Sequence, residues 1–295
     1  MKMLFRNVCL LILLFMLAGC GPGQGNVIAL FMATPTPTNV PATATPIPSA
    51  TPTFTPEPTA TPVPPSATPT PVRVRTGPGE IICPILLYHR VDDLATSNPY
   101  VIGIQDFRQQ MQYLHDNGYQ TITVSELVAA INFGADLPEK PVVITFDDGD
   151  LSVYKNAYPI MVEYGFTGVA YLVGNYVGTS GYMDVDQLKA LAKSGWEMGS
   201  HTQGHADLSN CRFCDQEIVY SKAYLAEKLG VEINTFAFPF GIKTKKAMET
   251  VIANYKGAVG LGVFLNQGGY NLYYLWRRPI DNGTDMGTFI SYLPK

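Results

Sequence analysis

Two adjacent carboxylates follow a strongly apolar segment near the middle of the chain. Residues 142–146 read Val-Val-Ile-Thr-Phe, and Asp147 and Asp148 come directly after them. Neighbouring carboxylates repel each other and lose hydration when buried, so such a pair needs a cation, a shared proton or open solvent. A solvated acidic turn explains this segment alone equally well.

A second strand-like segment, residues 196–200, runs directly into a pair of histidines. His201 and His205 lie four residues apart, and the chain has only four histidines. Two imidazoles and one carboxylate can bind a divalent metal and leave positions open for water. A structural pair of histidines is the alternative, but the two acids favour a metal site and hydrolysis by an activated water.

The surrounding sequence alternates between strand-like and helix-like segments. The expected strands are residues 81–88, 142–146, 168–173, 196–200, 235–238, 258–264 and 274–280. The expected helices are residues 104–117, 125–133, 151–164, 184–194, 215–229 and 244–253. Repeated strand–helix units predict an α/β fold with a parallel sheet, and about seven of them favour a (β/α) barrel over an open sheet. Because chemistry in a barrel lies where strands end, the acids and histidines are expected to meet there.

Four motifs resemble those of one enzyme family. They are Pro84–Val91 (PILLYHRV), Thr145–Gly149 (TFDDG), His201–His205 (HTQGH) and Phe236–Gly241 (FAFPFG). Together they resemble the polysaccharide deacetylases, also called the NodB-homology or carbohydrate esterase 4 family, and within it the branch with rearranged motifs that acts on poly-N-acetylglucosamine. The resemblance spans about residues 81–279 and implies a distorted barrel of NodB-homology type that hydrolyses acetyl groups on a polysaccharide.

The resemblance also implies a division of roles between the acids and the histidines. Asp148, His201 and His205 would bind a divalent metal, which is most often zinc in this family. Asp147 would be the general base that takes a proton from the water that the metal activates. This division is physically sensible, because a metal lowers the pKa of its water toward ~7, where a carboxylate can take the proton.

Other residues are expected to act on the reacting amide. The backbone N–H of Phe240, which follows Pro239, is at the position that in the family helps to hold the oxyanion. A departing amine must also be protonated, and no histidine follows His205 in this chain. The resemblance to the rearranged branch, which places its acid histidine on the first strand, implies that His89 is the general acid, with a purely structural role at a strand end as the alternative.

One motif residue departs from the family pattern. The family commonly has an arginine shortly before the Pro-aromatic pair, where it orients the base, but Asn234 and Ala237 occupy those positions here. We expect Arg278 to supply the guanidinium from another strand, because arginine suits a bidentate grip on a carboxylate. Arg277 is the alternative, since strand alternation lets only one of the two side chains face the barrel mouth.

The N-terminal part of the chain has a different composition. Residues 1–20 have a basic start and an apolar segment too short for a membrane span, and they end in Leu-Ala-Gly-Cys. This ending resembles a lipobox and predicts a signal peptide with acylation of Cys20; an ordinary signal peptide and an uncleaved anchor extended through Val27 to Met32 are the alternatives. Residues 21–71, rich in Thr and Pro, are expected to form a disordered, extended tether. Residues 72–295 then form the catalytic domain, anchored through the lipid to a membrane outside the cytoplasm, at the cell surface.

The remaining cysteines and the charge balance bear on partners. In an exported protein Cys211 and Cys214 are expected to form a disulfide that shapes the loop after His205, whereas Cys83 is expected to be a free core thiol. The chain has 20 basic and 24 acidic residues and no run of Lys or Arg, which argues against nucleic acid as a partner. A polysaccharide and a membrane are the expected partners, and no protein partner is predicted.

The expected function is metal-dependent hydrolysis of N-acetyl groups on an N-acetylglucosamine polymer. An O-acetyl esterase acting on a glycan is the nearest alternative, and it would depend less on His89 because an alkoxide leaves more easily than an amine. A carbohydrate-binding lipoprotein without turnover is a third possibility, which the missing motif arginine supports. Several aromatic residues could stack on sugars, although core packing is the more common role for such residues: Tyr176, Tyr182, Tyr270, Tyr273, Tyr274 and Trp276.

Overall fold

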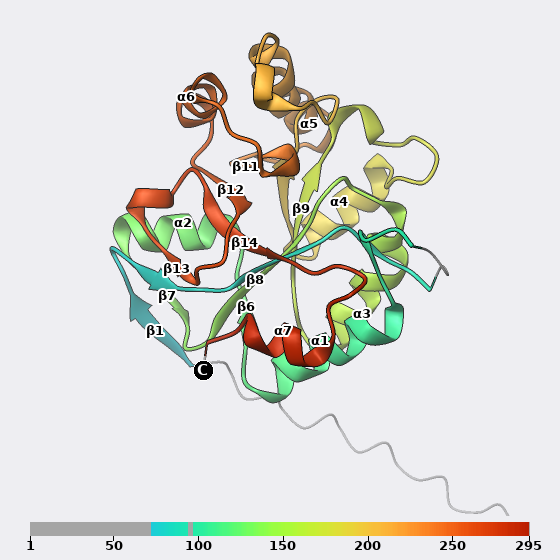
Figure 1. Ribbon diagram of the computed structural model, residues 1–295, viewed down its shortest axis with the longest axis vertical. Coiled ribbons are helices and arrows are strands. Elements are labelled where there is room, and N and C mark those ends of the chain that lie inside the picture. Colours follow the sequence, from blue (N-terminus) through green and yellow to red (C-terminus); the bar gives the residue numbers. More distant parts are fainter. Residues whose placement is uncertain (1–71, 94–96, 295) are drawn as a thin grey trace, which may run out of the picture. The chain divides into compact units, whose positions relative to one another are not determined.

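Seven parallel strands close into a barrel in the computed structural model, which describes residues 72–93 and 97–294. In order around the ring they are β3 (Ile85–Tyr88), β14 (Leu275–Pro279), β12 (Gly257–Leu261), β11 (Thr235–Ala237), β10 (Glu197–Ser200), β9 (Val169–Leu172) and β8 (Pro141–Phe146). The barrel closes because β8 pairs with β3 as well as with β9 (Figure 1). The predicted barrel of about seven strands is confirmed.

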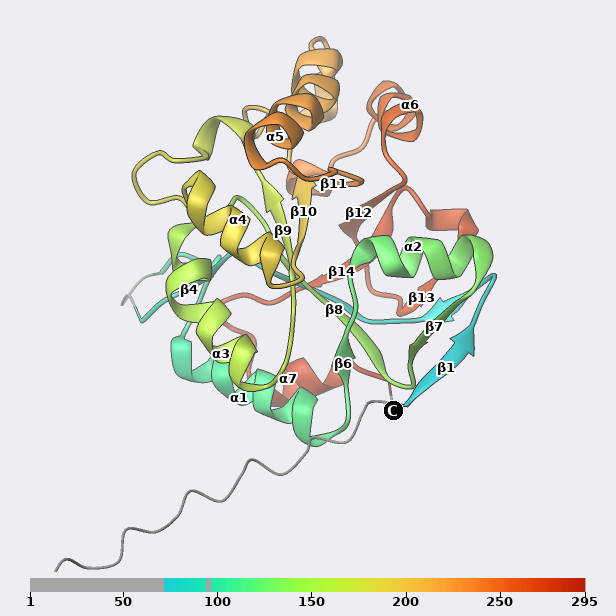
Figure 2. The ribbon, with the colours of Figure 1, turned by 180° about the vertical axis from the view of Figure 1, so that it is seen from behind.

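Helices connect most of the barrel strands and cover their outer side. They are α1 (Ile104–Asp116), α2 (Val124–Phe133), α3 (Tyr158–Glu163), α4 (Val185–Lys193), α5 (Ser221–Leu229), α6 (Lys245–Asn254) and α7 (Met286–Ser291). α1 packs against α3 and α7, and α4 packs against α5 (Figure 2). No helix among the described residues is long and apolar enough to span a membrane.

Short elements complete the domain. β1 (Arg73–Thr76) pairs with β7 (Ala135–Pro138), β2 (Ile81–Ile82) with β13 (Asn266–Gln267), β4 (Arg90–Val91) with β5 (Val101–Ile102), and β6 (Gln120–Thr121) with β8. The short helical turns are η2 (Gly174–Tyr176), η3 (Leu208–Asn210), η5 (Pro239–Gly241) and η6 (Gly269–Asn271). The π-helical segments η1 (Val153–Ala157) and η4 (Asp215–Tyr220) run directly into α3 and α5.

Strand alternation separates two layers of core. One cluster of buried residues fills the barrel and includes Ile85, Val143, Tyr171, Val259 and Leu275. On β3, β8 and β9 the neighbouring residues along the strand belong to the cluster under the outer helices, as Leu86, Ile144 and Ala170 do. All six residues of β8 are buried, because one face of the strand meets the barrel interior and the other meets the helices.

The predicted strand at residues 81–88 is two strands in the structure. Ile81 and Ile82 pair with β13 outside the barrel, and the barrel strand begins after Pro84. Proline has no backbone N–H to donate to a ladder, which places it at a strand boundary. The predictions for the signal peptide, for acylation of Cys20 and for the tether at residues 21–71 lie outside the described residues.

Candidate active site

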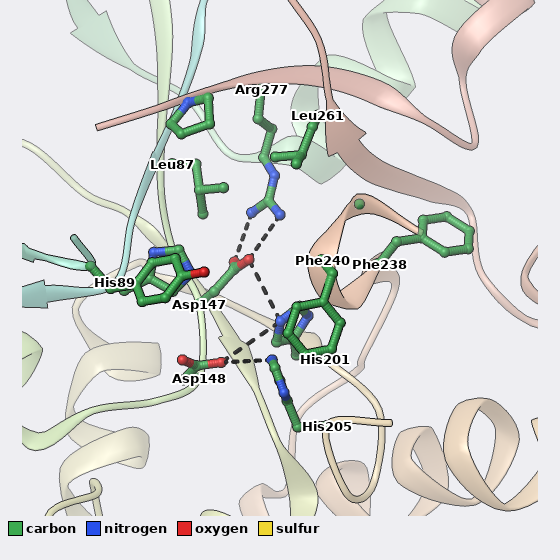
Figure 3. A pocket seen from close by; sticks show the side chains of 13 residues that line it. Leu87, His89, Asp147, Asp148, His201, His205, Phe238, Phe240, Leu261 and Arg277 are labelled. Atoms are coloured by element: carbon green, nitrogen blue, oxygen red, sulfur yellow. Dashed lines mark hydrogen bonds and ion pairs between the residues drawn. The ribbon is translucent and has the colours of Figure 1, made fainter. Parts of the chain in front are cut away.

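A cavity of about 250 Å³ opens at the carboxyl end of the barrel. It is lined by residues that follow β3, β8, β10 and β11, as well as by residues of β12 and β14 (Figure 3). The lining includes these six residues that the sequence singled out: His89, Asp147, Asp148, His201, His205 and Phe240. Residues from distant parts of the chain therefore meet where strand ends converge, as expected for a parallel barrel.

Asp148, His201 and His205 form the candidate metal site. Their nearest ligand atoms all lie within 4.8 Å of one another. Asp148 Oδ1 lies 3.7 Å from His201 Nε2 and 3.3 Å from His205 Nε2. That oxygen is buried without a hydrogen-bond partner, which is unfavourable unless a cation or a proton satisfies it. One carboxylate and two imidazoles at this spacing fit a zinc-like divalent ion that keeps a position open.

The ring of His201 is oriented by the backbone. Its Nδ1 lies 2.9 Å from the carbonyl oxygen of Ala237, at the end of β11. If Nδ1 carries the proton and donates to this carbonyl, Nε2 points toward Asp148 with its lone pair free, which is the arrangement that metal-binding histidines use. Burial lowers the pKa of His201 to about 4, so the neutral ring needed for ligation predominates at neutral pH.

The backbone is strained at this end of the barrel. Among the described residues, four that are not glycine have a positive φ: Asp148 at 72°, Thr202 at 68°, His205 at 58° and Phe240 at 58°. Each such residue costs about 1–3 kcal/mol and persists only where the surrounding structure enforces it. Three of the four line the cavity and the fourth follows His201, so the strain gathers where the chemistry is expected.

Asp147, which follows β8, is held by an arginine of β14, and only β3 lies between these two strands in the ring. Its two oxygens lie 2.7 and 2.8 Å from Nη1 and Nη2 of Arg277. The same Nη1 donates to the hydroxyl of Thr145, and Arg277 Nε donates to the carbonyl of Gly260. Both members of the pair are almost fully buried, and a buried pair is favourable only when such additional hydrogen bonds satisfy it.

The prediction that Arg278 orients Asp147 is therefore wrong, and Arg277 has this contact. Along β14 buried and partly exposed residues alternate, and Leu275 and Arg277 are the buried ones. Arg278 points the other way, and its guanidinium lies 4.8 Å from the ring of Tyr292. Consecutive side chains of a strand point to opposite faces, so a shift of one residue in register exchanges them. Because the two residues are both arginines, the sequence did not show which of them faces inward.

The charge of Asp147 depends on its arginine. Burial by itself would raise the pKa of Asp147, but Arg277 and His201 outweigh burial and hold it at about 2. For its neighbour the balance is reversed, because burial and the charge of Asp147 raise the pKa of Asp148 to about 6. The two adjacent acids therefore have different environments, which suits different roles.

His89 lies in the cavity on the side of Asp147 opposite to His201 in the view of Figure 3. Its ring centroid is 4.6 Å from that of Tyr100. Burial lowers the pKa of His89, and the charges of Asp147 and Asp148 act in the opposite direction. Tyr100, which is 52% exposed, also lines the cavity, and no sequence motif singled it out.

Phe240 and Pro239 form the turn η5 at the end of β11. Phe240 has a positive φ, lines the cavity and presents a ring that is 56% exposed. This ring meets that of His205 edge to face at 4.8 Å. The proposed use of the Phe240 backbone N–H stays a prediction, but the turn lies beside the candidate metal ligands.

Glu217 supports the loop that carries His205, and sequence reasoning missed it. Its carboxylate accepts a hydrogen bond from the N–H of Gly204, and its carbonyl accepts one from the N–H of Gln203. The disulfide between Cys211 and Cys214, as predicted, closes the segment between this loop and η4. Cys83 is buried and free, as predicted.

Comparisons with known proteins agree with this geometry. Residues 134–256 match the family model described as polysaccharide deacetylase. A Bacillus subtilis protein, YxkH, named as a candidate polysaccharide deacetylase, is 29% identical over 216 residues, which cover 71% of this chain and 75% of that protein. A polysaccharide deacetylase from Bacillus cereus, BC0361, has a similar crystal structure, with a TM-score of 0.66 and 27% identity over 73% of this chain and 70% of the other.

A further relative carries a more specific name. The poly-beta-1,6-N-acetyl-D-glucosamine N-deacetylase of Staphylococcus epidermidis is 26% identical over 159 residues. This match covers 48% of this chain and 55% of that relative, so the chain spans about half the length of this protein.

Proposed function

Because the chain carries a polysaccharide deacetylase domain, a hydrolase acting on amide bonds, we propose that it removes N-acetyl groups from a polymer of N-acetylglucosamine in a metal-dependent reaction. The observation that carries the proposal is one cavity in which Asp148, His201 and His205 converge beside a second, arginine-bound carboxylate. The name of the Staphylococcus epidermidis relative supports N-acetylglucosamine as the substrate unit.

The residues of the cavity divide the work of amide hydrolysis among them. A divalent ion, for which we propose zinc, would polarise the amide carbonyl and make a water more acidic. Asp147, kept ionised by Arg277, takes a proton from the attacking water. The backbone N–H of Phe240 donates to the oxygen that becomes negative as the tetrahedral carbon forms. His89 donates a proton to the nitrogen as the C–N bond breaks, so that the sugar leaves as an amine.

Hydrolysis of O-acetyl groups on a glycan is the second candidate function. It is favoured by the direction in which burial shifts His89, because burial lowers the pKa of the ring and an alkoxide needs a proton donor less than an amine does. A turnover-deficient binding protein has less support, because its main argument was a missing arginine and Arg277 grips Asp147.

The place of action is part of the proposal. We propose that a lipid on Cys20 anchors the chain to a membrane and that residues 21–71 let the domain reach a polymer at the cell surface. Labelling with a radioactive fatty acid tests the anchor, because the label should enter the wild-type chain and not a Cys20→Ala variant.

Acetate release from oligomers of N-acetylglucosamine tests the reaction itself. The chain is treated with a chelator and assayed with and without added zinc, beside Asp147→Asn and a matched Asp186→Asn variant at an exposed position on α4. Release that needs metal, is lost in Asp147→Asn and persists in Asp186→Asn would support the proposal. Release from O-acetylated glycan alone would favour the second candidate, and no release from either substrate would contradict both.

A further inference from the structure

One side of the barrel lacks a covering helix. β12 and β14 are joined by residues 262–274, which contain β13 and the turn η6 but no α-helix (Figures 1 and 2). The neighbouring connection, from β11 to β12, contains α6. The outward-facing side chains of β14, Trp276 and Arg278, are only partly buried.

Aromatic rings occupy this uncovered side. The ring of Trp276 lies directly against Gly262, where a Cβ atom would come within 2.3 Å of it. Phe264 and Tyr270 flank Trp276, with ring centroids at 4.9 and 5.8 Å. Phe264 is 60% exposed and Tyr270 is 62% exposed. Large apolar rings gathered at a surface mark a binding site more often than isolated exposed residues do.

A groove of about 430 Å³ continues from these rings to α6. Its wall combines the aromatic rings of Tyr273, Tyr274 and Trp276 with the ammonium group of Lys243 and with Met248 and Ile252 of α6. Flat apolar faces with hydroxyl and ammonium groups at their edges suit a sugar ring, which has apolar C–H faces and a rim of hydroxyls. A lipid surface would gain little from these polar groups.

The groove lies beside the catalytic cavity, and residues that line one contact residues that line the other. The hydroxyl of Tyr274 donates a 2.5 Å hydrogen bond to the carbonyl of Gly241, and Gly241 lines the cavity. On the other side Leu261 lines the cavity and is followed directly by Gly262, on which Trp276 packs. The groove and the cavity are thus neighbours at two places, at Gly241 and at Leu261.

We propose that this groove, formed by Lys243, Tyr270, Tyr273, Tyr274 and Trp276 and extended by Phe264, binds the sugar units that flank the unit being deacetylated. The inference rests on the proposed function, since the occupant is the rest of the same glycan chain. A polymer with one unit at Asp148 would extend past Gly241 and Leu261 and stack its next units on Trp276 and Tyr270. The groove would make the enzyme favour polymers over short oligomers.

Intrinsic fluorescence tests the groove without relying on turnover. The chain has two tryptophans, and Trp196 is only 4% exposed, so Trp276 is the one that a ligand can reach. We expect a hexamer of β-1,6-linked N-acetylglucosamine to cause a saturable change in emission of the full chain in the presence of chelator. The change should disappear in Trp276→Phe, and the Kd should rise at least fivefold in Tyr270→Ala. A matched Phe133→Ala variant, exposed on α2, should bind as wild type does.

Kinetics with short and long substrates give the second readout. The ratio of kcat/KM for the hexamer to that for the dimer should fall at least fivefold in Tyr270→Ala and Phe264→Ala, mainly through KM. Normal hexamer binding by these variants, or an emission change with phosphatidylcholine vesicles but not with the hexamer, would overturn the proposal. If the wild-type chain released acetate but the groove variants bound the hexamer normally, the proposal for the groove would be wrong and the proposed deacetylase function would stand. Hexamer binding at Trp276 without any acetate release would support the groove and reject the deacetylase function.

Discussion

The imidazole of His89 shares the catalytic cavity with two carboxylates, and its surroundings determine how it can act. It is outside the group of three candidate metal ligands, so its loss should leave metal binding intact. We expect His89→Ala to lower kcat on N-acetylated oligomers about 100-fold or more, as for loss of a general acid. The zinc content, measured by atomic absorption, should stay at the wild-type level.

A histidine outside the site provides the control for this variant. His115 is exposed at the end of α1, and His115→Ala should retain full activity. On an O-acetylated substrate the loss in His89→Ala should be smaller, because an alkoxide leaves with less assistance. Near-normal deacetylation by a zinc-loaded His89→Ala enzyme would show that the ring has only a structural role.

The pair of arginines in β14 allows a direct comparison. Arg277→Ala leaves the carboxylate of Asp147 buried without its partner. We therefore expect the free energy of unfolding, measured in urea, to fall by about 3–5 kcal/mol and deacetylation to be nearly lost. Arg277→Lys keeps the charge but not the two parallel hydrogen bonds, and its activity should be intermediate. Arg278→Ala should keep most of the activity. If Arg278→Ala were the inactive variant, the interpretation of the Asp147 contact would be wrong.

The site residues differ in how well the sequence predicted them. Asp147, Asp148, His201 and His205 directly follow apolar segments, so their place at strand ends could be read from the chain. The choice between Arg277 and Arg278 could not, since it depends on which face of β14 turns inward. Tyr100 was also missed, because its position over His89 depends on how a loop returns to the cavity.

At the scale of elements, a partly buried glutamate joins a strand to a helix. Glu197, in β10, accepts hydrogen bonds from the backbone N–H and hydroxyl of Ser125 in the first turn of α2, and from the hydroxyl of Thr235 in β11. Burial raises the pKa of Glu197 above its ordinary value of 4.5 in spite of these bonds. The folded protein therefore holds this proton at pH values where the unfolded chain has released it.

This shift has a definite consequence for the pH dependence of stability. The proton on Glu197 adds to the free energy of unfolding. This contribution is fully present below pH 4.5, the ordinary pKa of the carboxyl, and is lost as pH rises through the higher pKa of the folded state. Between pH 5 and about pH 8 the free energy of unfolding should fall less in Glu197→Gln than in wild type. Urea titrations at several pH values measure this difference. Glu227→Gln, exposed on α5, should keep the wild-type slope. Equal slopes in all three proteins would contradict the shift.

Strands and helices were predictable to different degrees. Continuous apolar segments such as residues 142–146 predicted the barrel strands, because strands buried on both faces need no alternation. The expected helix at residues 151–164 is confirmed as a continuous helical stretch over residues 151–163, in which the π-helical segment η1 runs into α3, and Pro159 has no N–H to donate within it. The sequence did not indicate that the connection between β12 and β14 lacks a helix, because the aromatic residues in this connection are equally typical of a core.

At the scale of the whole molecule, the number of strand–helix units predicted a barrel, whereas its closure depends on contacts between distant segments. β3 and β8 are separated by more than fifty residues and pair from Ile85 with Val143 to Tyr88 with Phe146. This pairing brings His89 next to Asp147, because each follows the last residue of its strand. Closure of the ring thus completes the cavity.

The candidate metal site should also couple parts of the ring that do not pair directly. Asp148 follows β8, and the two histidines follow β10, with β9 between the two strands. An ion bound to all three side chains favours the folded state, in which they converge, over the unfolded chain, in which they do not. At a free zinc concentration of a hundred times Kd, this linkage adds about 2.7 kcal/mol to the free energy of unfolding.

We therefore expect the Tm in calorimetry to rise with zinc concentration and to fall again when a chelator is added. His205→Ala should abolish most of this dependence, because two ligands hold the ion much less tightly than three. His115→Ala should keep the full dependence, which excludes a nonspecific effect of zinc on surface histidines. A Tm that does not respond to zinc in the wild-type chain would argue against a metal at this site, and then Asp147 would have no activated water from which to take a proton.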